Sequence, residues 1–296
     1  MIYDKSMSRR VFLIINYTIL LLISLLCILP FINLLAVSFS SSAAVSAGSV
    51  TFWPVEFTTK AYEFALTGGS FFSSLWVAIQ RTVIGTLVNL VLIVLTAYPL
   101  SKSKQKLMGR NIYMGFFIIT MLFSGGLIPT YLVVVKMGLI DSIWSLILPG
   151  ALPVFSMIIL MNFIRGLPEE IEESAIIDGA GPVQVLLRIL LPLLKPALAT
   201  VGLFSIVAHW NSWFDGIIYM NNPDNYPLQS YLQTLLQSFE QIMLKSGSDY
   251  TQLLSMMNAR TGRAAQMFLG AIPILLVYPF LQKYFTKGLV LGSVKG

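Results

Sequence analysis

Long stretches without a charged residue alternate with short polar segments along the whole chain. A helix needs about 20 mostly apolar residues to cross roughly 30 Å of hydrocarbon, and uncharged stretches of about that length recur six times. The second helix is expected to start before its uncharged stretch, so that Arg81 lies inside its outer end. We therefore expect an all-α membrane protein, one transmembrane domain over residues 1–296, with about six spans at about 11–37, 73–101, 111–135, 142–164, 196–214 and 264–282.

Composition supports a membrane protein. Of the 296 residues 56% are hydrophobic and only 11% are charged, whereas a soluble domain has about 25% charged residues. A signal peptide is the alternative for the first stretch, because Lys5, Arg9 and Arg10 precede it. Signal-peptide cores are about 7–15 residues long, and this stretch is uncharged from Val11 to Val37, so we expect it to remain as a membrane anchor.

The positive residues predict how the chain is oriented, because Lys and Arg resist translocation. Thirteen of them lie in the two terminal segments and the loops after the second and fourth spans, and five lie in the remaining loops. We therefore expect both termini to be cytoplasmic in the plasma membrane of a bacterium. The net charge of +6 then serves attraction to anionic headgroups, and a nucleic-acid partner is not needed to explain it.

Chemistry-bearing motifs are scarce. The single cysteine, Cys27, and the single histidine, His209, can form neither a disulfide nor a histidine-rich metal site within the chain. The sequence has no Gly-rich phosphate loop, no nucleophile elbow and no zincin histidine pair. We expect no cofactor on this chain and no enzymatic activity of its own.

The loop between the fourth and fifth spans, 165–195, has more pattern than a linker needs. Pro168 suits a first helical turn, and the four glutamates within 169–173 suit the positive end of a helix dipole. The run 179–181, Gly-Ala-Gly, can end that helix before Pro182 opens a second one that runs to about residue 191. A loop lying on the lipid surface is the alternative, but clustered glutamates are repelled by an anionic leaflet, which favours docking onto another protein.

This loop resembles a known motif. The run 173–179, ESAIIDG, is followed after nine residues by ILLP at 189–192. It resembles the signature E-A-A-x-x-x-G-x9-I-x-L-P of permease subunits of binding-protein-dependent ABC importers. Only Ser174 departs from it, replacing one small residue by another.

Further segments extend the resemblance over nearly the whole chain. AYPLSK at 97–102, IPTY at 128–131 with Gly138-Leu139, and KGLVLGSVKG at 287–296 are similar to the carbohydrate branch, of the maltose-permease inner-subunit type. FSGGLIPT at 123–130 and HWNSWFD at 209–215 resemble a subgroup found beside lipoprotein sugar-binding proteins in Gram-positive bacteria, which includes oligosaccharide and pectin-fragment systems.

The resemblance implies the fold of a type I ABC importer permease and a heteromeric assembly. Two homologous permeases would form the pore, an ATPase dimer holding ATP and Mg²⁺ would bind below, and an extracellular lipoprotein would deliver an oligosaccharide. A cytoplasmic coupling helix in 165–195 would dock on the ATPase. The residues implied to couple to the ATPase are Glu172, Glu173, Ser174, Ala175, Asp178, Gly179, Ile189 and Pro192.

The outer half of the fifth span carries a candidate sugar path. Trp210 and Trp213 could stack on a sugar ring, and Asn211 and Asp215 could bind its hydroxyls. The spacing of three residues places the two tryptophans on one helix face. The alternative is an interfacial anchor or packing against the partner permease, because tryptophan is enriched at membrane interfaces in any case.

Two other classes of protein compete with the importer. An ion-coupled secondary transporter would place ionisable residues in mid-span and often shows internal repeats. Neither is visible here, since Arg81 and Asp215 lie near predicted outer ends and His209 stands alone. A membrane-embedded enzyme is disfavoured because no nucleophile and base stand together in the spans.

Overall fold

The structure is a computed structural model that describes residues 7–67, 70–234, 260–273 and 275–276. It divides into two compact units, one formed by 1–69 with 234–271 and the other by 70–233 with 272–296. All regular secondary structure in the described residues is helical. The terminal motif at 287–296 lies outside the described residues, as does the end of the expected sixth span beyond residue 276.

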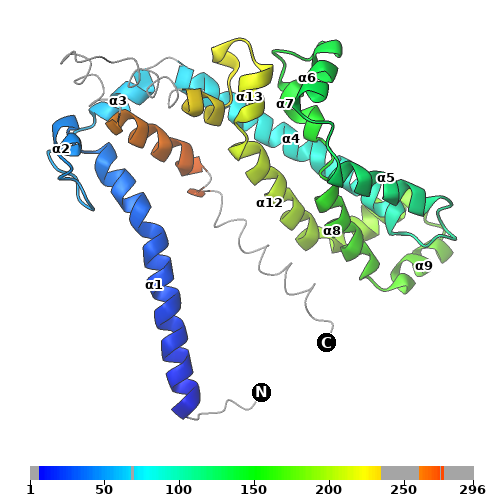
Figure 1. The fold of residues 1–296 in the computed structure, drawn as a ribbon. Coiled ribbons are helices and arrows are strands. Elements are labelled where there is room, and N and C mark those ends of the chain that lie inside the picture. Colours follow the sequence, from blue (N-terminus) through cyan, green and yellow to red (C-terminus); the bar gives the residue numbers. More distant parts are fainter. Residues whose placement is uncertain (1–6, 68–69, 235–259, 274, 277–296) are drawn as a thin grey trace. The chain divides into compact units, whose positions relative to one another are not determined.

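The first unit is built on one long helix, α1 (Met7–Ser38), followed by α2 (Ser42–Ser46) and α3 (Lys60–Thr67) (Figure 1). The ring of Phe39 stacks on Phe57, with 5.3 Å between the centroids, and the hydroxyl groups of Ser38 and Tyr62 lie 2.8 Å apart. These contacts fold the segment after α1 back onto its end. Along α1 the large apolar side chains are mostly exposed, as expected for a helix whose solvent is lipid.

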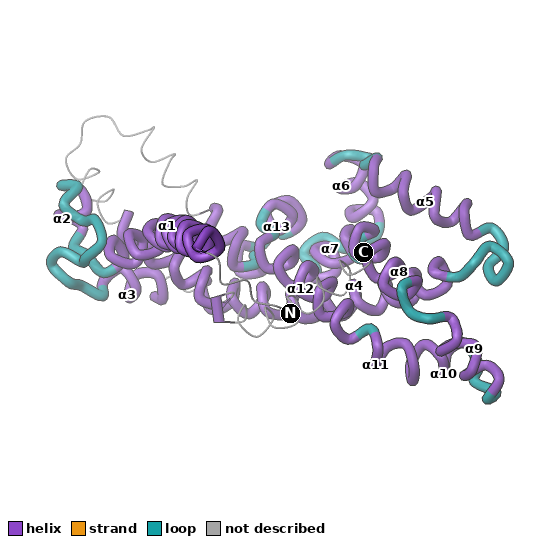
Figure 2. Tube along the Cα trace, turned by 90° about the horizontal axis from the view of Figure 1, so that it is seen from below, coloured by secondary structure: helices purple, strands orange, loops and turns teal. Residues whose placement is uncertain are grey.

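The second unit is organised around α4 (Ser70–Ser101), which packs against both α8 (Val154–Arg165) and α12 (Lys195–Asn211) (Figures 1 and 2). α4 presents Ala97 and Ile93 fully buried in the core. The core continues past the end of α4 to Val185 and Leu190, in the loop 165–195. The expected second span therefore corresponds to a single long helix that starts at Ser70 and includes Arg81.

The expected third and fourth spans each correspond to a bent pair of helices rather than to one continuous helix. α5 (Arg110–Leu122) and α6 (Leu127–Lys136) meet at 112°. α7 (Ile143–Ile147) with the 3₁₀ turn η1 (Leu148–Gly150) meets α8 at 53°. The breaks have local causes, because Gly126 has φ +87° and Pro153, which precedes α8, has no N–H to donate.

The loop after α8 is helical for most of its length. α9 (Glu169–Ile177) is followed by α10 (Pro182–Gln184), the π-helical turn η2 (Val185–Leu190) and α11 (Leu191–Leu193). The segment 182–193 meets α12 at 82°. Prolines at 192 and 196 flank that bend and remove two amide donors from it.

The fifth span ends earlier than the sequence predicts. α12 stops at Asn211, and Ser212 is extended, with φ −74° and ψ 125°. A separate short helix, α13 (Phe214–Tyr219), and the 3₁₀ turn η3 (Pro223–Asn225) follow. Ser212 accommodates this break because its hydroxyl bonds the Asp215 carboxylate, which fixes the new turn.

Two helices among the described residues, Arg9–Ser38 and Ser70–Ser101, are long and apolar enough to cross a membrane alone. Counting each bent pair as one span raises the number to five. The expected sixth span corresponds in part to a described helix at 260–273. The total of six therefore stays a prediction.

Different loops contact the two ends of α4, at Ser70 and at Ser101. At its first end Ser70 donates to Asp224 (3.2 Å), and Asp141 accepts from the backbone N–H of Asn221 (2.8 Å). At its last end Arg110 donates to the carbonyl of Leu100 (2.8 Å). The bent pair α5–α6 thus starts near one end of α4 and leads toward the loops gathered at the other.

Candidate functional site

The predicted helix, turn and helix of the loop 165–195 are present. Three glutamates occupy the first turn of α9, where their negative charge interacts favourably with the positive end of the helix dipole. Gly179 has φ +83°, a conformation that glycine adopts without strain. The amide of Ala180 donates to the carbonyl of Ala175 (2.9 Å) and closes the end of α9.

An ion pair fastens α9 to the end of α4. The ammonium group of Lys102 bonds the carboxylate of Glu172, and it also lies 4.2 Å from the centre of the Tyr98 ring. The hydroxyl of Tyr98 lies 3.5 Å from the same carboxylate. Both partners of the ion pair are largely shielded, with 15% and 19% of their side chains exposed, so the pair is worth more than one on an open surface.

Two guanidinium groups hold the last carbonyls of α4. Arg165, at the end of α8, donates to the carbonyls of Leu100 (3.0 Å) and Ser101 (3.3 Å). Arg110, at the start of α5, donates to the same Leu100 carbonyl. These carbonyls have no partner inside the helix and carry the negative end of its dipole. The ends of α4, α8 and α5 are therefore tied together beside α9.

The residues of the sequence motif divide between the inside and the outside of this loop. Ala175 is buried, Ile189 packs against the core, and Glu172 turns inward to Lys102. The remaining residues of the predicted set are exposed: Glu173, Ser174, Asp178, Gly179 and Pro192. The inward residues hold the loop, and the outward ones are free to meet a partner.

Four apolar side chains on the same loop are exposed beside Glu173. Ile177 is 85% exposed, Val183 is 67%, Leu187 is 55% and Ile176 is 52%. We call Glu173 and these four residues the docking surface. Several large exposed apolar side chains on one loop, together with charged residues, are typical of a protein interaction site.

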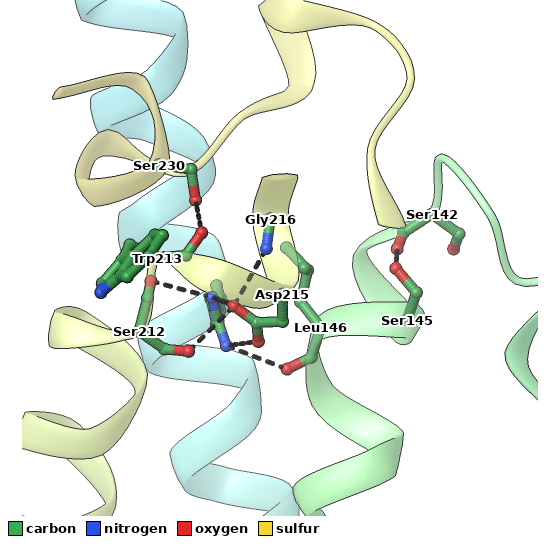
Figure 3. Close-up of polar contacts among 9 residues, drawn as sticks. Ser142, Ser145, Leu146, Ser212, Trp213, Asp215, Gly216 and Ser230 are labelled. Atoms are coloured by element: carbon green, nitrogen blue, oxygen red, sulfur yellow. Dashed lines mark hydrogen bonds and ion pairs between the residues drawn. The ribbon is translucent and has the colours of Figure 1, made fainter. Parts of the chain in front are cut away.

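A buried ion pair lies in the first half of α4, away from its end at Ser101. The guanidinium of Arg81 bonds both carboxylate oxygens of Asp215, the carbonyl of Ser212 (3.2 Å) and the carbonyl of Leu146 (3.3 Å). Only 3% of the Arg81 side chain is exposed. Figure 3 shows Ser212 and Asp215 converging on this point from one segment and Leu146 from another. The pair thus holds the break between α12 and α13 against α4 and α7.

Further along α4 from Arg81, α4 and α12 contact each other through polar groups. Arg81, Gly85 and Asn89 follow one another at intervals of four residues, which places them on one face of α4. Oriented by its neighbours, the Asn89 amide donates to the carbonyls of Gly85 (3.1 Å) and Ala151 (3.0 Å) and accepts from Nε2 of His209 (3.3 Å). The hydroxyl of Ser205 lies 3.3 Å from the amide end that faces His209. This polar layer was not predicted from the sequence. The four-residue spacing of Arg81, Gly85 and Asn89 is the sequence signal that could have identified it.

The predicted sugar-path residues do not share one helix face, and this premise is wrong because α12 ends between the two tryptophans. Trp210 is 7% exposed and borders an apolar cavity of about 370 Å³ with Thr82 and Val83. Trp213 lies beyond the break, and Figure 3 shows its ring pointing away from Leu146. Asn211 donates to the carbonyl of Val207 (3.0 Å). Asp215 alone of the four reaches the polar layer.

Comparison with known proteins gives similarity over the full length. The chain is 41% identical to the polygalacturonan/rhamnogalacturonan transport system permease protein YtcP of Bacillus subtilis (strain 168), over 98% of this chain and 100% of that protein. It is 42% identical to protein LplC of the same organism, over 99% and 97% of the two chains. No family model matches the sequence.

A solved structure also matches. It is a bacterial ABC transporter involved in the import of the acidic polysaccharide alginate, with a TM-score of 0.82 and 32% sequence identity. The match covers 95% of this chain and 98% of the other. Both the order of the helices and their arrangement are therefore shared with a protein of known structure.

Proposed function

Because the chain belongs to the permease subunits of sugar-transporting ABC importers, we propose that its docking surface binds a separate ATPase and drives the import of an oligosaccharide. Membership of this family makes the chain a membrane-embedded transport component rather than an enzyme, and it replaces the ion-coupled transporter as an explanation. The importer in turn implies a second permease, an ATPase pair and a substrate-binding protein.

The observation that carries the proposal is the contrast between the two sides of the loop 165–195. Its inner side is held by Lys102, Ala175 and the core, whereas its outer side exposes Ile177, Val183 and Leu187 around Glu173. Burying these apolar groups in a groove would stabilise a complex by about 25 cal/mol per Å² of apolar surface. Glu173 would add a charge-assisted hydrogen bond to a donor on the ATPase.

The contacts behind the docking surface explain how a movement would pass into the membrane. When the ATPase pair closes on ATP, α9 moves with it, and Glu172 carries the end of α4 through Lys102. Arg165, at the end of α8, donates to the carbonyl of Leu100 and so ties α8 to the same end of α4. ATP then favours one pore state because the ATPase binds the two states differently.

We propose an oligosaccharide that contains uronate units as the substrate. The support comes from two similar proteins, one a polygalacturonan/rhamnogalacturonan transport permease and the other a transporter that imports the acidic polysaccharide alginate. The assay is sugar-stimulated ATPase activity of the purified complex with its binding protein, against a panel of acidic and neutral oligosaccharides. Stimulation by neutral oligosaccharides alone would refute the uronate substrate.

Gly179 offers a test of the docking role. A Cβ atom at Gly179 would meet nothing within 4 Å inside this chain, and asparagine tolerates a positive φ. Gly179→Asn should therefore leave membrane insertion intact and reduce uptake at least about tenfold, because the added side chain enters the ATPase interface. Gly138→Asn is the matched control, since Gly138 has φ +66° and equally open surroundings in a different loop.

Normal uptake by Gly179→Asn would contradict the docking role. Equal losses in the Gly179 and Gly138 variants would show an effect of backbone strain alone. Co-purification of the ATPase with each variant separates the two outcomes, because only a lost interface weakens the complex.

A further inference from the structure

We propose that a partly open cavity lined by residues of α4, α7, α8, α12 and α13 is a saccharide subsite of this permease, one that binds sugar hydroxyl groups rather than carboxylates. The inference rests on the proposed function. The cavity has a volume of about 540 Å³ and lies wholly within the second unit. Its walls include Asn89, Ser156, Ser205 and His209, with the Arg81–Asp215 pair at one side.

These polar groups are set in the helices that form the membrane part of the unit. Asn89 and Ser205 are each 3% exposed, Ser156 is 4% and His209 is 8%. Polar groups inside a bilayer are costly and mark substrate pathways more often than the same groups do in soluble proteins. Hydrogen bonds between helices explain Asn89 and His209, but they do not explain why the layer borders a cavity large enough for a ligand.

The chemistry of the walls fits a sugar ring. Amide, hydroxyl and imidazole groups both donate and accept hydrogen bonds, as sugar hydroxyls require. Phe155, Phe204 and Tyr219 add aromatic surface to the same cavity, and such surface can cover the apolar side of a ring. Ligand sites commonly combine a mostly apolar wall with a few placed polar groups.

The charge balance selects the kind of group that is bound. Arg81 is the only Lys or Arg among the described residues that line the cavity, and Asp215 neutralises it. A carboxylate would have to displace Asp215 from a bidentate pair that also holds two backbone carbonyls in place. A hydroxyl group needs no such displacement. The carboxylates of an acidic oligosaccharide are therefore expected to lie outside this subsite.

Protection of cysteines from chemical modification tests the site. Starting from Cys27→Ala, which removes the single native cysteine, Ser205→Cys places a thiol of similar size on the cavity wall. The assembled importer is treated with a small methanethiosulfonate reagent with and without galacturonan oligosaccharides at millimolar concentration. We expect the sugar to slow modification at least about fivefold, since a bound ring covers the thiol.

Thr82→Cys is the matched control. Thr82 is also buried on α4, but it borders the apolar cavity beside Trp210 instead. Protection of Thr82→Cys without protection of Ser205→Cys would overturn the proposal and move the sugar contact to the tryptophan side. Absence of protection at both positions, in a complex whose ATPase still responds to sugar, would also overturn it.

The proposed hydroxyl preference has its own measurement. Carboxyl-reduced, neutral galacturonan oligosaccharides should protect Ser205→Cys within about threefold of the acidic form, and a preference above tenfold for the acidic form would refute the assignment. Ser156→Ala should raise the KM for uptake about three- to tenfold, the loss expected for one hydrogen bond. If no sugar stimulates the parent complex, the proposed function itself fails, and the subsite fails with it.

Discussion

Gly85 lies against the ring of His209, where α4 packs on α12. A Cβ atom added there would lie 2.5 Å from Nε2 and 2.6 Å from Cε1 of His209. Because the ring also bonds Asn89, it cannot move aside without losing that contact. We expect Gly85→Ala to destabilise the protein by about 1–3 kcal/mol, the usual cost of an overpacked core, measured as a lower Tm in detergent.

Gly115 provides the comparison. It also lies in a helix, α5, but a Cβ atom there would meet nothing within 4 Å. Gly115→Ala should be neutral or stabilising by about 0.5–1 kcal/mol, because alanine favours helix. A Tm for Gly85→Ala equal to that of Gly115→Ala would show that the His209 ring yields freely.

Asp141 predicts a pH dependence outside the spans. Its carboxylate accepts from the backbone N–H groups of Asn222 (3.2 Å) and Asn221 (2.8 Å), and these bonds lower its pKa below the ordinary 3.8. A lowered pKa stabilises the fold above the unfolded value and loses that effect as pH falls through the folded value. Asp141→Asn keeps a residue suited to the positive φ of 60° and removes only the charge.

The Tm of the parent protein should therefore exceed that of Asp141→Asn at about pH 6, and the difference should shrink as pH falls below about 4. Because the parent protein and Asp141→Asn are compared at the same pH, the effects of acid on other groups cancel. A difference that stays constant down to about pH 2 would show that the charge of Asp141 contributes nothing to these bonds.

At the scale of helices, Lys102 and Glu172 form the connection between α9 and α4. Lys102→Glu places two like charges together in partly shielded surroundings, so we expect uptake to fall about tenfold while ATPase activity persists. Combining Lys102→Glu with Glu172→Lys restores opposite charges and should recover much of the uptake. The measured quantity is sugar transported per ATP hydrolysed in proteoliposomes.

Lys104 supplies the control for that experiment. It is exposed, and no ion pair is found for it among the described residues. Lys104→Glu makes the same change of charge two residues away and should leave coupling unchanged. If the double swap remains as uncoupled as Lys102→Glu, the ion pair does not transmit the movement.

The same scale shows what local sequence can and cannot determine. The start of α9 at Glu169 and its end before Gly179 were predicted, because a proline, a dipole and a glycine act within a few residues. The breaks after Leu122 and Asn211 were not. An uncharged stretch indicates only that lipid or protein surrounds it, and it does not show where a helix bends. The break after Asn211 is held by the ion pair of Arg81 with Asp215, whose residues are distant in sequence.

For the whole molecule, the contacts of the second unit sort its loops into two sets. Ser70, Asp141 and Asn221 mark one end of α4, while Lys102, Arg165 and Glu172 mark the other. At about 1.5 Å per residue, the helix Ser70–Ser101 is about 48 Å long, enough to separate these ends by a bilayer. The sequence alone predicted the same two sets from charge, without any contact to support them.

The positive residues predict which set is cytoplasmic. The end at Lys102 also carries Lys104, Lys106 and Arg110, whereas Lys136, the last residue of α6, is the single positive residue from the start of α6 to the end of α7. Loops rich in Lys and Arg stay inside. In a Cys27→Ala background, a cysteine at Lys136 should react with an impermeant maleimide added to intact cells, and one at Lys104 should react only after lysis. Labelling of Lys104→Cys from outside would invert the orientation. Labelling of both or of neither in intact cells would mean that α5–α6 returns to the side on which it started, against the contacts at both ends of α4.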